Sequence, residues 1–220
     1  GLVGTLNIGL CEARGYYIAR MDQDDWSHPH RLVEQVGFLD ANPEYGLVGS
    51  WIDVVNTDMS TRYVDRFPVT DDMIRLMLSM QNAFAHGAVM MRKNLQVQYR
   101  SEFDLAEDFD LWCRLSAVTK MANIAKALYR WTYNPAGITL SQASAQFAVA
   151  KRIQTWYNHS PGSRRPHALT RQTVQQERAA RGRKRLWIDL VRLTIFFLRT
   201  GDVQRFLRIG FNALEALVLP

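Results

Sequence analysis

The sequence predicts an α/β fold in which strands alternate with helices, and three observations lead to this prediction. Short runs of β-branched and aromatic residues recur along the first part of the chain. Segments in which apolar residues repeat at helical spacing lie between these runs. The 220 residues are 47% hydrophobic and 22% charged, which supplies apolar surface for one sizeable core. Strands that alternate with helices are typical of a layered sheet covered by helices.

The predicted elements follow one another from the amino end. Residues Tyr16 to Ala19 predict a short buried strand, since they are β-branched and aromatic and precede a cluster of acids. Pro29 suits the first turn of a helix that ends near Asp40, before the helix-stopping pair Asn42-Pro43. The buried face of this helix is expected to carry Leu32, Val33, Val36 and Leu39. Residues 45–55 then predict a strand.

The alternation continues through the middle of the chain. A short helix is predicted from Asp71 through Met80, and a strand over residues 88–91. Apolar residues at helical spacing predict a helix that starts near Glu107 and leads to a strand over residues 128–133; they are Leu111, Leu115 and Val118. Residues 141–158 favour another helix.

A break after residue 158 sets the predicted domain organisation. Residues 160–166 read Ser-Pro-Gly-Ser-Arg-Arg-Pro, which interrupts the helical pattern and indicates a linker. We therefore expect a domain over residues 1–158, a linker over 159–170 and a basic, amphipathic helical tail over 171–220. Residues 1–150 carry 13 Lys or Arg against 17 Asp or Glu, and residues 151–220 carry 14 against 4. The formal net charge of +6 thus arises in the tail.

Cysteine usage and the first residues narrow the class of protein. Cys11 and Cys113 show neither paired nor metal-ligand spacing, so they predict no disulfide framework and favour a reducing compartment. The first residue is Gly1, and no cationic leader precedes an apolar run, so no signal peptide is expected.

Three carboxylates, Asp22, Asp24 and Asp25, follow the first predicted strand. Carboxylates this close together repel one another, and a cation relieves the repulsion. Hard oxygen ligands favour Mg²⁺ or Mn²⁺, and Mg²⁺ typically takes one or two protein carboxylates together with substrate phosphates. Ligands of open α/β sheets bind at the carboxyl ends of strands, so the cluster predicts a divalent-metal site that holds a diphosphate. Alternatively the cluster is a solvated turn in which Asp25 or Ser27 caps the helix near Pro29.

A series of short blocks occurs in order along residues 4–140. They are Asn7-Ile8-Gly9-Leu10, Ala13 to Asp25, Arg31-Leu32 with Gln35, Asn42-Pro43-Glu44, Val48-Gly49-Ser50, Asn82 with His86, Val89 to Arg92, Glu107 to Leu115, and Tyr129-Arg130. Together they resemble the family 2 glycosyltransferases of GT-A fold, and several agreeing blocks are more specific than a lone Asp-x-Asp. The resemblance implies a GT-A mixed sheet flanked by helices.

The same resemblance implies that the front of the domain is missing and gives roles to the acids. The strands and helix that open this family's domain and bind the nucleotide base have no counterpart, so the fold is expected to be N-terminally truncated and base-binding residues are not assigned. Asp24 would ligate Mg²⁺ or Mn²⁺, and Asp22 would help through the metal shell or the ribose. Asp25 would contact donor or acceptor, with helix capping as its alternative role.

A second acidic pair, Glu107-Asp108, would open a helix beneath the acceptor site. An inverting sugar transfer needs a base that takes the proton of the acceptor hydroxyl, and the resemblance makes Asp108 that base. Glu107 would raise the proton affinity of Asp108 by like-charge repulsion, whereas the helix amino end would favour both anions. Outside this block, the pair would be ordinary first-turn acids.

Three further residues complete the expected donor- and acceptor-binding set. His86 would line the site, although a lone histidine before an apolar strand is also typical of a hydrogen-bonded core residue. Arg130 would grip a phosphate or the acceptor, with a buried strand end as the alternative. Trp112 would form a pocket wall or part of the core. His28 and His30 are expected to be solvated and not to bind the metal.

The tail combines clustered cations with apolar helical segments. Residues 178–185 are basic and precede the apolar run Leu186 to Leu198, whose polar stripe would be Asp189, Arg192 and Arg199. This pattern fits a helix at a membrane surface. Neither this run nor residues 203–219 is long and apolar enough to span a bilayer. The alternative is a helical hairpin that packs on its own domain or on another copy of the chain. No nucleic-acid module is recognisable, so nucleic acid is not expected as a partner.

The sequence therefore predicts a metal-dependent, inverting glycosyltransferase. It would move a sugar from a nucleoside diphosphate sugar to a saccharide or lipid-linked acceptor in bacterial cell-surface polysaccharide synthesis, in the cytoplasm or at the inner face of the plasma membrane. One rival is a nucleotidyltransferase, which gives no reason for the block that begins at Glu107. The other rival is a non-catalytic assembly or binding subunit.

Overall fold

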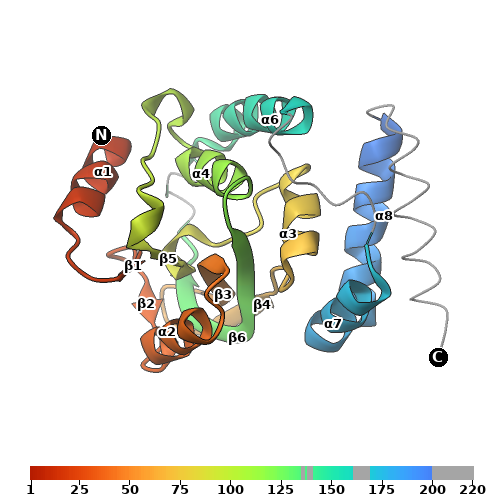
Figure 1. The fold of residues 1–220 in the computed structure, drawn as a ribbon, viewed down its shortest axis with the longest axis horizontal. Coiled ribbons are helices and arrows are strands. Elements are labelled where there is room, and N and C mark those ends of the chain that lie inside the picture. Colours follow the sequence, from red (N-terminus) through yellow and green to blue (C-terminus); the bar gives the residue numbers. More distant parts are fainter. Residues whose placement is uncertain (135–136, 138–140, 161–168, 200–220) are drawn as a thin grey trace.

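A mixed sheet with helices on both faces forms the centre of the molecule (Figure 1). The computed structural model describes residues 1–134, 137, 141–160 and 169–199, without the side chains of 194–199. The helices are α1 (Leu2–Glu12), α2 (Arg31–Ala41), α3 (Asp71–Leu78), α4 (Glu107–Leu115), α6 (Ala143–His159), α7 (Arg171–Arg181) and α8 (Arg183–Arg199), with the 3-10 turns η1 (His86–Ala88), η2 (Lys93–Leu95) and η3 (Ser101–Phe103). The strands are β1 (Tyr17–Ala19), β2 (Trp26–Ser27), β3 (Tyr45–Val55), β4 (Thr61–Asp65), β5 (Met90–Arg92) and β6 (Lys120–Thr132).

The sheet is built around two long parallel strands. Its order is β1-β5-β3-β6-β2, and β4 pairs with β3 outside this path. β3 and β6 run parallel over most of their length, so a crossover that contains α3 and α4 connects them. The short strands β1, β2, β4 and β5 each pair antiparallel with a neighbour. The mixed, helix-covered sheet confirms the predicted fold class.

Adjacent residues of three strands face opposite layers of the core. Leu47, Met91 and Met121 pack with α3, α4 and α6, whereas their neighbours Val48, Met90 and Ala122 pack with Leu39 of α2. This alternation is the period of a strand, and it requires both faces of the sheet to be apolar. The near-continuous burial of β3 follows from its central place, and residues 45–55 form the strand that the sequence predicts.

Other boundaries differ from the predicted ones. β6 starts at Lys120, well before the predicted residue 128, because its first half pairs in parallel with β3 although exposed residues interrupt its apolar pattern. α4 begins at Glu107 as expected but ends at Leu115, and Val118 is 67% exposed beyond it. Ala88 belongs to η1, so β5 starts at Met90.

The predicted apolar face of α2 is wrong at Leu32 and Val33, whereas Leu39 is buried and Val36 packs against the same cluster. Leu32 is 53% exposed and Val33 is 65% exposed, whereas the side chains of Arg31 and Gln35 are buried. Arg31 Nη2 donates to the carbonyls of Arg20 and Val89, and Gln35 Nε2 donates to those of Val48 and Ala88. Buried carbonyls require hydrogen-bond donors, so α2 presents the polar side chains of Arg31 and Gln35 to the sheet.

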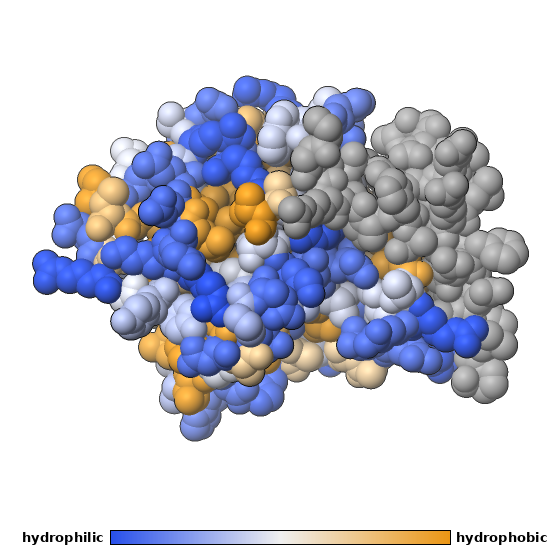
Figure 2. Space-filling view, in the orientation of Figure 1, coloured by the Kyte–Doolittle hydropathy of each residue, from blue (hydrophilic) through white to orange (hydrophobic). Residues whose placement is uncertain are grey.

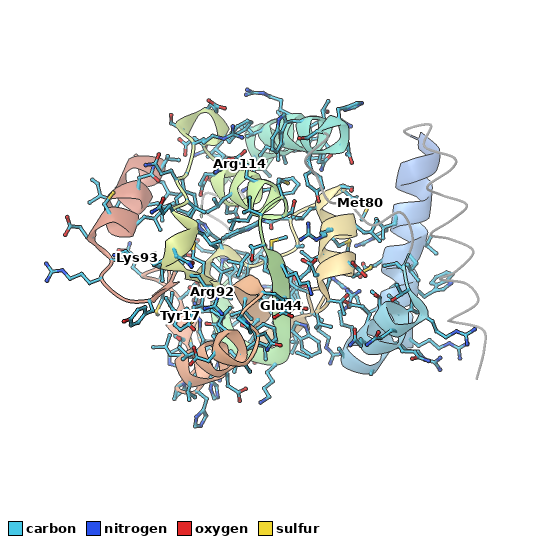
Figure 3. All side chains as sticks on the ribbon, in the orientation of Figure 1. Tyr17, Glu44, Met80, Arg92, Lys93 and Arg114 are labelled. Atoms are coloured by element: carbon cyan, nitrogen blue, oxygen red, sulfur yellow. The ribbon has the colours of Figure 1, made fainter. Side chains whose placement is uncertain are left out.

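The predicted burial of the first strand is only partly correct. Tyr16 is 92% exposed and precedes β1, while Tyr17 and Ile18 are half-buried. β1 stands at the end of the described sheet and pairs only with β5. Tyr17 and Arg92 lie together at this edge (Figure 3), where the guanidinium sits 5.5 Å from the centre of the tyrosine ring.

The helices after residue 169 pack against α3 (Figure 1). Leu186, Leu190 and Leu193 of α8 lie in one cluster with Met73 and Leu76 of α3, as the hairpin alternative expects. Asp189 is fully buried, so it is not part of a solvent-facing polar stripe. Within the described residues, no helix is long and apolar enough to cross a membrane. The predicted linker falls mostly on residues 161–168, and the second apolar run on 203–219; both lie outside the described residues.

Candidate active site

The acidic cluster lies in the turn between β1 and β2, and β6 holds it in place. The backbone amide of Asp22 donates to the Tyr129 hydroxyl at 3.0 Å, and this hydroxyl donates to Asp25 Oδ2 at 2.8 Å. The Thr132 amide donates to Asp25 Oδ1 at 2.9 Å, and the Thr132 hydroxyl donates to the carbonyl of Asp24 at 2.9 Å. Two residues of β6 thus fix the backbone of the turn, and the Asp24 side chain is exposed.

Asp25 does not cap α2, so the capping prediction for Asp25 and Ser27 is wrong. α2 starts at Arg31, its cap residue is His30, and no side chain accepts a hydrogen bond there. Ser27 belongs to β2. Burial raises the pKa of Asp25, while the hydrogen bonds from Thr132 and Tyr129 oppose the rise. The structure therefore gives Asp25 a supporting contact with β6.

Asp22 forms an ion pair with Arg20, the residue that follows β1. The Arg20 side chain is 12% exposed and the Asp22 side chain is 36% exposed. Burial raises the pKa of Asp22, and the nearby Arg20 charge and its hydrogen bond oppose this rise. Asp22 thus enters the site already paired, whereas Asp24 presents its carboxylate to solvent.

Few of the described side chains are placed to act as ligands of a metal ion. In the part of the chain that the structure describes, no group of three or more histidine, cysteine or acidic side chains is placed to hold a metal. The exposed Asp24 and the half-exposed Asp22 are hard oxygen donors on a turn whose backbone is fixed. One or two carboxylates completed by substrate phosphates suit Mg²⁺ or Mn²⁺, so these residues fit such a site.

The second acidic pair opens α4, and Asp108 is held by two donors. Asn82 Nδ2 donates to Asp108 Oδ2 at 2.7 Å, and the Phe109 amide donates to Asp108 Oδ1 at 2.7 Å. Burial raises the pKa of Asp108, and these two hydrogen bonds and the Arg20 charge oppose the rise. Hydrogen bonds to a carboxylate favour its ionised form, so Asp108 is oriented as a proton acceptor.

Glu107 is buried and accepts fewer hydrogen bonds than Asp108. It is 5% exposed, and its Oε2 atom has no hydrogen-bond partner among the described residues. Burial and the charge of Asp108 raise the pKa of Glu107 to about 7. Its Oε1 atom is 3.8 Å from Nδ1 of His86, and burial lowers the pKa of His86, so this histidine is neutral at pH 7.

A hydrogen-bonded chain connects His86 to the first helix. His86 Nε2 and the Tyr99 hydroxyl are 2.9 Å apart. The Asn7 side chain of α1 accepts from the Tyr99 amide at 2.8 Å and donates to the Tyr99 carbonyl at 2.9 Å. His86 is therefore both a hydrogen-bonded interior residue and a neighbour of Glu107, which brings its two predicted roles together.

The charge of Arg20 acts on both acidic groups. It opposes the rise in the pKa of Asp22, Glu107 and Asp108, and it helps to lower the pKa of His86. A charge acts this way only on groups a short distance away, because solvent screens longer separations. The turn after β1 and the amino end of α4 therefore both lie near Arg20.

Two predicted ligand-binding residues make no described side-chain contact with Asp22, Asp24, Glu107 or Asp108. Trp112 is fully buried, and its ring lies beside Phe84 and His86. This placement corrects its predicted pocket-wall role, because a side chain without exposed surface cannot touch a ligand. Arg130 Nε is 3.8 Å from Asp53 Oδ2, and its guanidinium lies 4.4 Å from the centre of the Trp26 ring. The described contacts of Arg130 therefore include none of the acids.

Several residues of the site carried no assigned role in the sequence. Arg20 and Asn82 belong to the recognised blocks, and a polar residue beside an apolar strand is the signal that could have marked them. Thr132 and Tyr99 give no such signal. Thr132 meets Asp25 across 107 positions and Tyr99 meets Asn7 across 92, so only the folded chain brings them together.

Comparisons with known proteins give glycosyltransferases. The model of the family Glycosyl transferase family 2 matches residues 1–97. An uncharacterized glycosyltransferase of Haemophilus influenzae is 24% identical over 166 residues, which cover 70% of this chain and 51% of that protein. The amylovoran biosynthesis glycosyltransferase AmsE of Erwinia amylovora is 29% identical over 134 residues, covering 59% and 50%. The O-antigen biosynthesis glycosyltransferase WbnJ of Escherichia coli is 33% identical over 114 residues, covering 50% and 44%.

The chain spans about half the length of these curated relatives. The matched region contains β1, the acidic turn, β3 and the segment with Asn82 and His86. The mixed sheet with helices on both faces is the GT-A type of architecture that the sequence predicts. The family match over residues 1–97, the related glycosyltransferases and this architecture make the chain similar to the family 2 glycosyltransferases.

Proposed function

We propose that this chain carries the catalytic centre of a metal-dependent, inverting glycosyltransferase. The donor would be a nucleoside diphosphate sugar, and the acceptor a saccharide or a lipid-linked sugar. One observation supports the proposal: Arg20 forms an ion pair with Asp22 in the acidic turn, and its charge also acts on Glu107 and Asp108 at the amino end of α4. A single displacement reaction requires the groups that bind the sugar donor and the group that activates the acceptor to lie near one another.

On the donor side, Asp24 would ligate Mg²⁺ or Mn²⁺, and Asp22 would support it. Such a metal ion, when bound, offsets negative charge on a leaving diphosphate. Arg20 would add a guanidinium next to the same phosphates, since it is held beside Asp22. Asp25 and Tyr129 would keep the turn in position.

On the acceptor side, Asp108 would act as the base. The acceptor oxygen would form a bond to the anomeric carbon as the bond from that carbon to the diphosphate oxygen breaks. The proton of the acceptor hydroxyl would pass to Asp108, and the bonding electrons would leave with the diphosphate. Asn82 would aim the Asp108 carboxylate, and neutral His86 with Glu107 would border the acceptor.

The biological setting follows from the relatives and is part of the proposal. AmsE and WbnJ are named for amylovoran and O-antigen biosynthesis. We therefore propose that this chain acts in bacterial cell-surface polysaccharide synthesis. A lipid-linked acceptor would place it in the cytoplasm at the inner face of the plasma membrane.

The test pairs one variant for each side of the site. Asp24→Ala is expected to abolish Mn²⁺-dependent binding of nucleoside diphosphates, measured by isothermal titration calorimetry over a panel of UDP, GDP and dTDP. Asp108→Asn is expected to keep this binding and to lower sugar transfer on the order of 10²- to 10⁴-fold, the usual contribution of a general base. Transfer is measured as nucleoside diphosphate released in the presence of candidate acceptors.

Matched controls use an exposed acid outside the site. Asp58→Ala and Asp58→Asn, in the turn after β3, should leave binding and transfer unchanged. Metal-dependent binding that survives Asp24→Ala contradicts the metal assignment, and turnover that survives Asp108→Asn contradicts the base assignment. Hydrolysis of nucleoside triphosphates in place of nucleotide sugars would favour a nucleotidyltransferase, and binding without any turnover would favour a non-catalytic subunit.

A further inference from the structure

The helices α7 and α8 use one face for the protein interior and leave the other face outside. Leu186, Leu190 and Leu193 of α8 pack with Met73 and Leu76 of α3, together with Val174 and Leu169. Met80, at the end of α3, also packs against this cluster (Figure 3). Residues at positions i, i+4 and i+7 lie on one side of a helix, so this contact uses a single face of α8.

The acidic side chains of α7 and of the described part of α8 form ion pairs inside the protein. Glu177 and Asp189 are fully buried, and each is bonded to Arg181, at 2.7 Å and 2.6 Å. Glu177 Oε1 also accepts from the amides of Val69 and Thr70 at the start of α3. No negative side chain of α7, or of α8 up to Leu193, therefore reaches the surface.

Cations and apolar residues form the outward side of α8. Lys184 and Arg192 are exposed, Trp187 is 53% exposed, and Ile188 and Val191 lie half-exposed between them. On α7 the exposed side chains include Arg171, and the surface over this helix is hydrophilic in Figure 2. We call Lys184, Trp187, Ile188, Val191 and Arg192 the outer face of α8.

We propose that the outer face of α8 binds the surface of an anionic phospholipid membrane. Cations without neighbouring exposed acids are attracted to anionic headgroups. An aliphatic pair beside a tryptophan, between the two cations, suits the boundary between headgroups and acyl chains. Apolar side chains make no favourable contact with the phosphates of a nucleic acid, so a lipid surface is favoured over a polyanion as the partner.

The docking of α7 and α8 on α3 gives this surface a fixed position relative to the sheet. The residues that fill the interior, Leu186, Leu190 and Leu193, are different from those of the outer face, so membrane contact needs no loss of protein packing. The membrane face is thus not the whole apolar run of the sequence but the side that α3 leaves uncovered. This inference does not depend on glycosyl transfer, because it concerns other residues.

The experiment measures binding of the whole chain to vesicles by flotation. Phosphatidylcholine vesicles that contain phosphatidylglycerol should bind the chain, and vesicles of phosphatidylcholine alone should not. Lys184→Gln with Arg192→Gln should weaken binding by about 25-fold, because each cation near an anionic surface contributes about fivefold. Trp187→Ala should weaken binding on the order of tenfold through loss of apolar insertion.

The control variant removes the same charge elsewhere. Arg14→Gln with Lys93→Gln changes two exposed cations at the opposite end of the molecule, where Lys93 lies in Figure 3, and should leave vesicle binding intact. If this control loses vesicle binding to the same extent, or if Trp187→Ala leaves vesicle binding unchanged, the binding is general charge attraction and the proposal is wrong. Equal binding to both vesicle types would also overturn it. So would sedimentation velocity runs in which the wild-type chain is a dimer that the outer-face variants dissociate.

Discussion

Tyr129 is the residue on which the acidic turn depends. Its hydroxyl accepts from the Asp22 amide and donates to Asp25, so it connects two positions of the turn to β6. A side-chain carbon at Gly87 would lie 2.3 Å from this hydroxyl, which no real contact allows. Gly87 is therefore required for the close approach of Tyr129, and a larger residue there would shift the turn that carries Asp24.

Glu107 should make the stability of the protein depend on pH. The pKa of Glu107 is about 7 in the folded chain, against an ordinary value of 4.5. Between these pH values the folded chain keeps the proton and the unfolded chain loses it. The free energy of unfolding therefore falls as pH rises through this window, by at most roughly 3 kcal/mol. The lowered pKa of His86 acts in the opposite direction below pH 6.5.

A comparison with Glu107→Gln isolates this effect. Urea unfolding from about pH 4 to about pH 8 should show that the variant lacks the decline in stability between pH 4.5 and 7, while the His86 contribution remains. Glu102→Gln, an exposed acid on η3, is the control and should follow the wild type. Parallel curves for wild type and Glu107→Gln would contradict the raised pKa.

Helix α2 joins the sheet through polar side chains. Arg31 and Gln35 occupy its buried face and supply donors to four carbonyls, while Leu32 and Val33 face solvent. These four carbonyls lie in or near the strands β1, β3 and β5, so the helix holds three strands of the sheet through polar contacts. Arg20, whose carbonyl accepts from Arg31, is thereby fixed at the start of the acidic turn.

This arrangement reverses the usual outcome of two substitutions. Gln35→Leu should lower the free energy of unfolding by about 2 kcal/mol, because it removes the side-chain donor that the buried carbonyls of Val48 and Ala88 share. Leu32→Gln should change it by less than about 0.5 kcal/mol, as expected for a surface position. Denaturant unfolding measures both. Equal effects of the two variants would show that the hydrogen bonds of Gln35 do not determine the packing of α2.

The carboxyl-terminal helices hold both ends of α3. Glu177 of α7 accepts from the amides at its start, and Asn158 of α6 donates to the Ser79 carbonyl just after its end. The chain then leads directly to Asn82, which donates to Asp108. Helices far along the sequence thus support the segment that orients the proposed base.

Loss of Glu177 should therefore weaken the whole molecule. Glu177→Ala leaves Arg181 with one partner fewer in a buried ion network and is expected to cost about 3 kcal/mol of unfolding free energy. Arg171→Ala, on the exposed side of the same helix, should cost less than about 0.5 kcal/mol. Thermal unfolding followed by circular dichroism compares them. A loss below about 1 kcal/mol for Glu177→Ala would mean that the helices are not coupled to α3 through this contact.

The sequence alone determined the alternation of strands and helices, the resemblance to the family 2 glycosyltransferases, and the places of the acids at a strand end and a helix start. These features are local, since periodicity and short blocks reside in consecutive residues. Only the tertiary structure decided that Arg20 lies near both groups of acids, that Tyr129 and Thr132 hold the turn, and that α2 packs through polar groups. Those contacts join residues that are far apart in the chain, and they arise because buried polar groups must find partners wherever the fold places them.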